Sequence, residues 1–122
     1  MKRTILPLLL VVALLSACTD KATVANYRVV PLPQEIVMND DASFVLKAST
    51  PIVCQGDEKM QRNALFLAEY IEEKCGLKLN VTDATAPKAI TLTIDPAMEN
   101  AEGYRLTVNT EGVNIVGASI HL

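Results

Sequence analysis

The chain has 122 residues, 11 basic and 14 acidic, which give a formal net charge of −3. This length accommodates one domain of ordinary size and leaves no room beside it for a second large domain. Basic residues form no stripe, aromatic residues make up 4% and tryptophan is absent, so the composition argues against nucleic-acid binding.

The first 17 residues have the order of an export signal. Met1, Lys2 and Arg3 are followed by an apolar run over residues 5–15, and small residues come next. The run is too short to cross the ~30 Å of hydrocarbon in a bilayer as a helix. A buried N-terminal helix is the alternative, but the run has no polar face for water. We therefore expect a signal peptide over residues 1–17.

The end of this signal, Leu15-Ser16-Ala17-Cys18, resembles the lipobox of bacterial lipoproteins. That resemblance implies that Cys18 becomes the first mature residue and carries a diacylglycerol, with a further acyl chain on its amine. Two or more acyl chains anchor a protein firmly. Ordinary cleavage after Ala17 is the alternative, and the large Leu15 disfavours it. We expect an exported protein anchored by lipid to the bacterial cell envelope, with the membrane leaflet left open.

Residues 18–26 are small and polar, which suits a tether between the lipid and a folded domain. Without Lys2 and Arg3, the 11 basic residues fall to 9 against 14 acidic ones, so the mature chain has a formal charge of −5. Pro31 and Pro33 follow within an apolar stretch, and they predict an extended edge segment because proline breaks helices and central strands. Residues 50–54 predict a short strand.

One clear amphipathic helix is predicted over residues 58–75. Asp57 is a suitable N-cap, and Gly76 stands where a left-handed residue ends a helix. Apolar residues recur at spacings of three and four and form a single stripe. The stripe consists of Met60, Ala64, Leu67, Ala68, Ile71 and Cys75.

Four further strands are predicted after the helix, over residues 77–81, 89–94, 104–108 and 113–116. The last two are joined by a turn in which we expect Gly112 to take a positive φ. Because the last links are short, we expect an α+β fold with a mainly antiparallel sheet and the helix packed on one face.

The sequence offers few residues for catalysis or metal binding. His121 is the only histidine, so a Ser-His-Asp or Cys-His site is implausible. Cys54 and Cys75 are separated by a helix about 27 Å long, which argues against a disulfide and favours two small buried hydrophobic residues. Metal-ligand clusters and glycine-rich phosphate loops are lacking, and we expect no cofactor.

Several stretches together resemble the N-terminal domain of family 20 glycoside hydrolases, the β-N-acetylhexosaminidases. They are "VVPLPQEI", "FVLKASTPIV", "CGLKL" after the helix, and "EGYRLTVNTEGVNIVGAS". The resemblance covers residues 27–119 and implies a non-catalytic α/β unit packed against a following (β/α)₈ barrel of about 250 residues. That barrel does not follow here, since residues 120–122 close the chain, and we expect a truncated fragment.

The resemblance to this family also implies a catalytic chemistry that this chain does not reproduce. In that family the sugar's acetamido group attacks its own anomeric carbon, helped by an Asp-Glu pair at the end of a barrel strand. Gly56-Asp57-Glu58 is similar to the core of that motif, but it opens an amphipathic helix, where Asp and Glu serve as capping residues. We therefore expect no catalytic residue, and whether the chain acts as an enzyme stays open.

Two other functions stay open beside the truncated hexosaminidase domain. A free-standing surface module would bind a glycan or a catalytic barrel on a separate chain. A fragment of another glycosidase class, such as an α-glucuronidase, would also begin with a similar domain. Without tryptophan, a sugar-stacking platform would depend on Tyr27, Tyr70 and Tyr104, and we expect the last two to pack between helix and sheet.

Overall fold

The computed structural model describes residues 32–38 and 43–119. Contacts divide the chain into two units, Met1–Ile36 and Val37–Leu122. In the first unit the described residues, 32–36, form neither helix nor strand. The predicted signal peptide, Cys18, the tether, Tyr27 and His121 lie outside the described residues.

The second unit begins with a strand, a helix and a strand. β1 spans Ile52–Cys54, α1 spans Glu58–Cys75, and β2 spans Val81–Thr82. The helix bounds and both predicted caps are confirmed: Asp57 accepts a hydrogen bond from the amide of Met60, and Gly76 has φ 69° and ψ 13°. The predicted strand over residues 77–81 is reduced to the two residues of β2. None of the helices within residues 32–38 and 43–119 has the length and hydrophobicity that a bilayer crossing needs.

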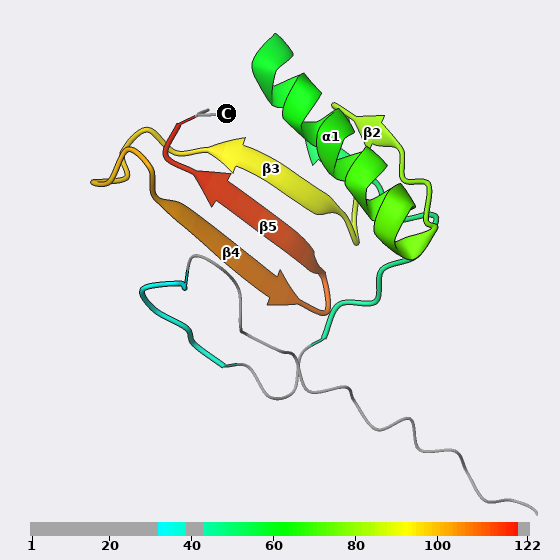
Figure 1. Cartoon of the computed structure of the whole chain (residues 1–122), viewed down its shortest axis with the longest axis horizontal. Coiled ribbons are helices and arrows are strands. Elements are labelled where there is room, and N and C mark those ends of the chain that lie inside the picture. Colours follow the sequence, from blue (N-terminus) through cyan, green and yellow to red (C-terminus); the bar gives the residue numbers. More distant parts are fainter. Residues whose placement is uncertain (1–31, 39–42, 120–122) are drawn as a thin grey trace, which may run out of the picture. The chain divides into compact units, whose positions relative to one another are not determined.

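Three longer strands complete a five-stranded sheet in the order β2-β1-β3-β5-β4 (Figure 1). β3 spans Ile90–Ile94, β4 spans Tyr104–Asn109, and β5 spans Gly112–Gly117. β1 pairs in parallel with both β2 and β3, and β3 pairs in parallel with β5. Only β4 runs antiparallel to its neighbour, β5. The α+β class with one helix is confirmed, but the prediction of a mainly antiparallel sheet is wrong.

The parallel pairing arises because none of the parallel pairs is joined by a direct hairpin. α1 carries the chain back along the sheet, so β2 enters in the same direction as β1. The segment over residues 95–103 then leads from β3 to the far edge, where β4 leaves room for β5 to insert beside β3. The short β4–β5 hairpin is therefore the one antiparallel pair, and it does not set the direction of the other strands.

The core lies between α1 and the β2–β1 end of the sheet. Ile52 and Cys54 of β1 are 0% exposed, and Met60, Ala64 and Ile71 of α1 are buried against them. Leu67 and Ala68 pack at the margin of this cluster. Because apolar stripes of a helix and of strands bury each other here, this contact supplies the main stabilisation of the fold.

The strand register places apolar and polar side chains on opposite faces. On β3, Ile90, Leu92 and Ile94 stand in register with Val113, Ile115 and Gly117 of β5. These three residues of β5 stand in register with Val108, Leu106 and Tyr104 of β4. This row continues the face on which α1 packs, because Ile52 and Cys54 are in register with Ile90 and Leu92. The intervening residues are mainly polar on β3, β5 and β4, including Thr91, Asn114 and Thr107.

Gly112 is required for a close approach of two strands and not for a special backbone angle. Its φ is not positive; among the described glycines only Gly76 has a positive φ. A Cβ at Gly112 would stand 2.7 Å from the carbonyl oxygen of Ala89. The same carbonyl accepts a 3.0 Å hydrogen bond from the amide of Val113. The expected positive φ is therefore wrong, and the steric reason for a glycine lies across the sheet.

Replacing Gly112 with Ala should destabilise the domain by about 1–3 kcal/mol, because backbone must move to accommodate the methyl group. Chemical denaturation followed by circular dichroism measures this loss. The neighbouring exposed Thr110→Ala variant is the control and should change stability by less than about 0.5 kcal/mol. Equal effects of the two substitutions would contradict the steric role of Gly112.

Candidate functional site

The acidic pair at Asp57 and Glu58 stands at the N-terminus of α1. Asp57 Oδ1 accepts a 3.0 Å hydrogen bond from the amide of Met60, and the Asp57 carbonyl accepts one of 3.0 Å from Gln61. Both acidic residues are exposed. The geometry is that of a helix cap, in which the side chain satisfies an amide that the helix leaves unpaired. The hydrogen bonds of Asp57 confirm its predicted capping role, and Glu58 lies in the first turn of α1.

The two cysteines occupy different environments. Cys54 is fully buried in β1, and burial, followed by the negative charge of Asp57, raises the pKa of its thiol above the ordinary value of 9.0. A protonated, buried thiol is a poor nucleophile. Cys75 is free and exposed at the last position of α1, so the prediction that both cysteines are buried is wrong for Cys75.

The tyrosines do not pack between helix and sheet as predicted. Tyr70 on α1 is 51% exposed and Tyr104 at the start of β4 is 55% exposed. Tyr70 lies beneath the Lys74 ammonium, which is 5.7 Å from its ring centre. Tyr104 follows the register of the apolar face, but α1 does not extend over β4 (Figure 1).

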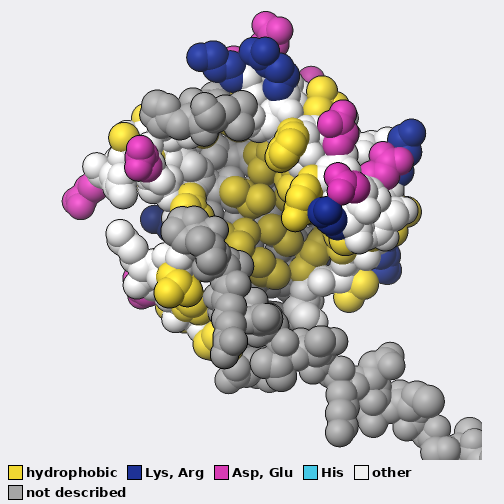
Figure 2. All heavy atoms as spheres, in the orientation of Figure 1, with side chains coloured by type: hydrophobic (Ala, Val, Ile, Leu, Met, Phe, Trp, Pro, Cys, Tyr) yellow, Lys and Arg dark blue, Asp and Glu magenta, His cyan; other side chains and the backbone are white. Residues whose placement is uncertain are grey.

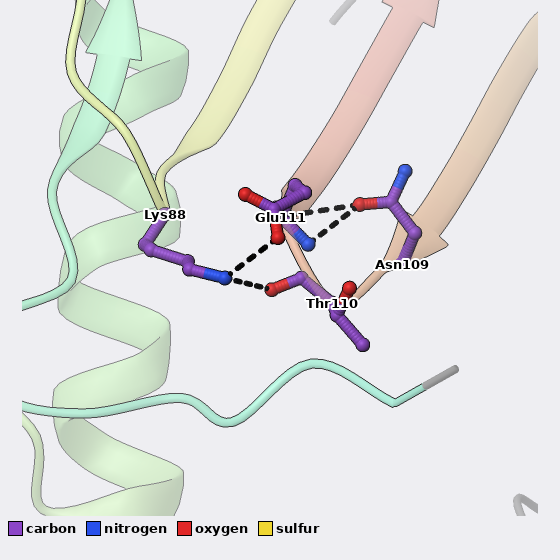
Figure 3. A network of polar contacts seen from close by, with 5 residues as sticks. Lys88, Asn109, Thr110 and Glu111 are labelled. Atoms are coloured by element: carbon purple, nitrogen blue, oxygen red, sulfur yellow. Dashed lines mark hydrogen bonds and ion pairs between the residues drawn. The ribbon is translucent and has the colours of Figure 1, made fainter. Parts of the chain in front are cut away.

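A small polar hollow lies beside the β4–β5 turn. Asn109 Oδ1 accepts hydrogen bonds from the amides of Glu111 and Gly112, at 2.8 and 3.1 Å, and so closes the turn. Lys88 Nζ donates to the Thr110 carbonyl at 2.7 Å and pairs with Glu111 at 2.9 Å (Figure 3). The hollow has a volume of about 280 Å³ and no aromatic residue lines it. It therefore lacks the stacking surface on which sugar rings are commonly held.

The described part of the chain contains no group of three or more His, Cys, Asp or Glu side chains that could hold a metal ion. Its two ion pairs, Lys74–Glu73 and Lys88–Glu111, join exposed side chains. Exposed pairs of this kind contribute little to stability, about 0–1 kcal/mol each. Neither pair gathers the buried charges that acid–base chemistry requires.

The most distinctive surface is the part of the apolar sheet face that α1 leaves open. We call it the uncovered half-face. Its exposed members are Ile94 at 38%, Val108 at 42%, Tyr104 at 55% and Leu106 at 56%. Leu92, Val113 and Ile115 are half-buried behind them. Figure 2 shows hydrophobic side chains gathered at the centre of this face, beside the charged outer surface of α1.

The exposed apolar side chains of this surface lie together on one face of the sheet, unlike the single apolar side chains that are dispersed over most protein surfaces. On the same three strands the opposite face carries Thr91, Asn114 and Thr107, which suit contact with water. Covering the exposed remainder of the four members would contribute about 1 kcal/mol each, given about 1.5–3 kcal/mol for complete burial of such a side chain. A contiguous apolar patch of this kind marks an interaction surface.

Comparison with known proteins identifies the class. The model of "Glycosyl hydrolase family 20, domain 2" matches residues 26–120. The chain therefore belongs to the family 20 glycosyl hydrolases. It is a non-catalytic accessory domain of a β-hexosaminidase-like protein, as its matches with the following two proteins indicate.

The first is the "Beta-hexosaminidase" of Porphyromonas gingivalis (strain ATCC BAA-308 / W83), which is 32% identical over 117 residues. These cover 88% of this chain and 15% of the relative. The second is the solved GH20 beta-N-acetylhexosaminidase from Streptomyces coelicolor A3(2), with a TM-score of 0.69 and 26% identity. The match covers 77% of this chain and 19% of that chain. The chain thus spans less than a fifth of the length of either protein.

Replacing Asp57 with Ala should destabilise the domain by about 1 kcal/mol, because the Met60 amide loses its acceptor. Thermal or urea unfolding measures this loss. Asp57→Asn keeps an acceptor at the same position, and it should retain most of the stability. A wild-type stability in Asp57→Ala would contradict the capping role.

Proposed function

We propose that the chain is the accessory layer of a β-N-acetylhexosaminidase and that its parent enzyme hydrolyses terminal β-linked N-acetylhexosamine. In this proposal a separate catalytic domain, a (β/α)₈ barrel, performs the reaction. The observation that carries the proposal is the uncovered half-face, an apolar surface on a domain whose acidic pair is engaged in capping a helix. Both relatives are hexosaminidases several times longer than the matched region, which supports it further.

The arrangement explains how such a domain could serve an enzyme without contributing to its chemistry. A glycosidase site needs two groups held on either side of the scissile bond in an enclosed cleft. Asp57 and Glu58 are exposed neighbours on a convex helix end. The domain instead offers a rigid sheet and an apolar surface, which can support a neighbouring domain through burial.

A free-standing glycan-binding module is the second reading of the sequence, and no observation favours it. The polar hollow beside Lys88 has no aromatic lining, and the exposed Tyr70 and Tyr104 lie on α1 and on the edge strand β4. A module that works alone would have little use for four exposed apolar side chains on one face of its sheet.

A domain exchange in the Porphyromonas gingivalis relative tests the proposed function. Deleting the relative's matched region should reduce its soluble hexosaminidase activity at least tenfold. The deletion would expose the apolar surface of the remaining protein that this region covers, and such a surface promotes aggregation. Inserting residues 27–119 of this chain in its place should restore most of that activity. The assay follows release of a chromophore from an aryl N-acetyl-β-glucosaminide.

Two controls accompany this exchange. The isolated mature chain should release no chromophore, and measurable hydrolysis by it would contradict the accessory role. A deletion variant as soluble and active as the intact relative, or a hybrid no better than the deletion, would also contradict the proposal.

We also propose that the chain is exported and anchored through Cys18 to the bacterial cell envelope. The order of basic, apolar and small residues before Cys18 supports this proposal. Two or more acyl chains would then hold the domain at a membrane surface.

The Cys18→Ala variant tests the anchor. We expect it to leave the membrane fraction for the soluble fraction, because its lipid attachment site is lost, and fractionation with immunodetection measures this. Ser16→Ala, which keeps Cys18, is the control and should stay with the membrane. Membrane retention of Cys18→Ala would contradict lipid anchoring.

A further inference from the structure

We infer that the connection between β2 and β3 is a strap that opens locally while the rest of the domain stays folded, and that Lys88 is the latch that holds it closed. The strap consists of residues 83–89, since β2 ends at Thr82 and β3 begins at Ile90. It lies on the face of the sheet opposite α1, and the inference does not depend on the proposed function.

The course of the strap follows from the strand order. β1 lies between β2 and β3, and all three strands are parallel, so the chain must pass over one face of β1 to reach β3. α1 packs on one of these faces. The strap residues Ala86 and Pro87 line the polar hollow together with Thr91 and Asn114. Because Thr91 and Asn114 belong to the polar face, the strap crosses β1 on that side.

Val53 shows that the strap covers β1. Its side chain points away from α1, because Ile52 and Cys54 on either side of it face the helix. Val53 is nevertheless only 3% exposed. Among residues 83–88, Ala86 alone is not exposed, as expected for the strap side chain that faces the sheet. A segment without helix or strand therefore buries this second face of β1.

Side-chain hydrogen bonds fasten the strap at its two ends. At the first end, Gln55 Nε2 donates to the Asp83 carbonyl at 2.8 Å. At the second end, Lys88 Nζ donates to the Thr110 carbonyl at 2.7 Å and pairs with Glu111 at 2.9 Å (Figure 3). Lys88 therefore joins the strap to the β4–β5 turn, 22 residues further along the chain.

The closed strap holds Lys88 in an unfavourable backbone conformation. Its φ is 53°, and in the described part of the chain no other residue except glycine has a positive φ. Side chains disfavour this region, so the conformation persists only where other contacts offset its cost. The bonds of the Lys88 ammonium to the turn are such contacts. Their loss leaves the strain without compensation and favours the open strap.

A strap held closed by the burial of Val53 alone is the competing account. In that account the ammonium of Lys88 would have no effect on opening. The exposure of the strap favours the latch, because five of residues 83–88 are exposed and few buried contacts hold such a segment in place.

Two adjacent positions on opposite faces of β1 separate opening of the strap from opening of the core. Two proteins span residues 18–122 and carry Cys18→Ser and Cys75→Ser. The first keeps Cys54, beneath α1, as its only thiol. The second also carries Val53→Cys and Cys54→Val, so its only thiol lies beneath the strap. Mass spectrometry follows labelling by N-ethylmaleimide, and each rate is divided by the rate of the same protein unfolded in urea.

The thiol at position 53 should react at least about tenfold faster than the thiol at position 54, because the strap opens without the core. Lys88→Met removes the ammonium and keeps the apolar stem. It should accelerate labelling at position 53 at least about fivefold and change labelling at position 54 less than about twofold. Lys74→Met removes a similarly exposed ion pair on α1 and is the control, which should change both rates less than about twofold.

Limited proteolysis tests the same opening in a protein that keeps Val53 and Cys54. In residues 18–122 with Cys18→Ser, the first cut that subtilisin makes within residues 43–119 should fall in the strap. Lys88→Met should accelerate this cut at least about fivefold, because cleavage follows the population of the open form. Lys74→Met should change its rate less than about twofold.

The inference is overturned if the two thiols react at equal normalised rates, or if Lys88→Met and Lys74→Met act alike on position 53. It is also overturned if the first cut within residues 43–119 lies outside the strap, or if Lys88→Met does not accelerate that cut. If the protein with Val53→Cys and Cys54→Val does not fold, the proteolysis decides alone.

Discussion

One helix can cover only about two strands of a sheet, and this limit governs the whole domain. α1 packs on β1 and β2, and the fully buried side chains Ile52 and Cys54 lie beneath it. β3 joins this core only through Ile90 and the margin at Leu92, and β5 and β4 lie further along the sheet, although their register continues the same apolar face. The domain is therefore well packed at one end and open at the other. Its stability and its role follow from this asymmetry.

The same asymmetry suits the accessory role that we propose for this family 20 domain. Acidic residues are present, but Asp57 is engaged with the Met60 amide and Glu58 lies on the exposed first turn of α1. The polar face and its hollow offer hydrogen-bonding groups without an enclosed cleft. What the domain presents most strongly is apolar area, and apolar area binds other protein surfaces through the removal of water.

Local features were predictable from the sequence, and features that depend on distant segments were not. The bounds of α1, its Asp57 cap and its Gly76 end follow from residues within one or two turns, and all three are confirmed. The parallel pairing of β3 with β5 depends on residues 95–103, which carry the chain past one strand position without any local mark in the sequence. Burial of Tyr104 was inferred from the alternation of apolar and polar residues over 104–108. Such alternation shows that one face of the strand is apolar, but it does not show what covers that face. Nothing in the residues around Gly112 indicated its close approach to Ala89.

Hydrogen exchange of residues 18–122 tests the central claim most directly, because β1 and β5 form a matched pair. Each strand has hydrogen-bonded neighbours on both sides, but α1 covers only β1. If cover by the helix sets local stability, amides of β1 should exchange at least about tenfold more slowly than those of β5. Equal protection of the two strands would contradict the account, because it would mean that the open half of the sheet is as stable as the covered half.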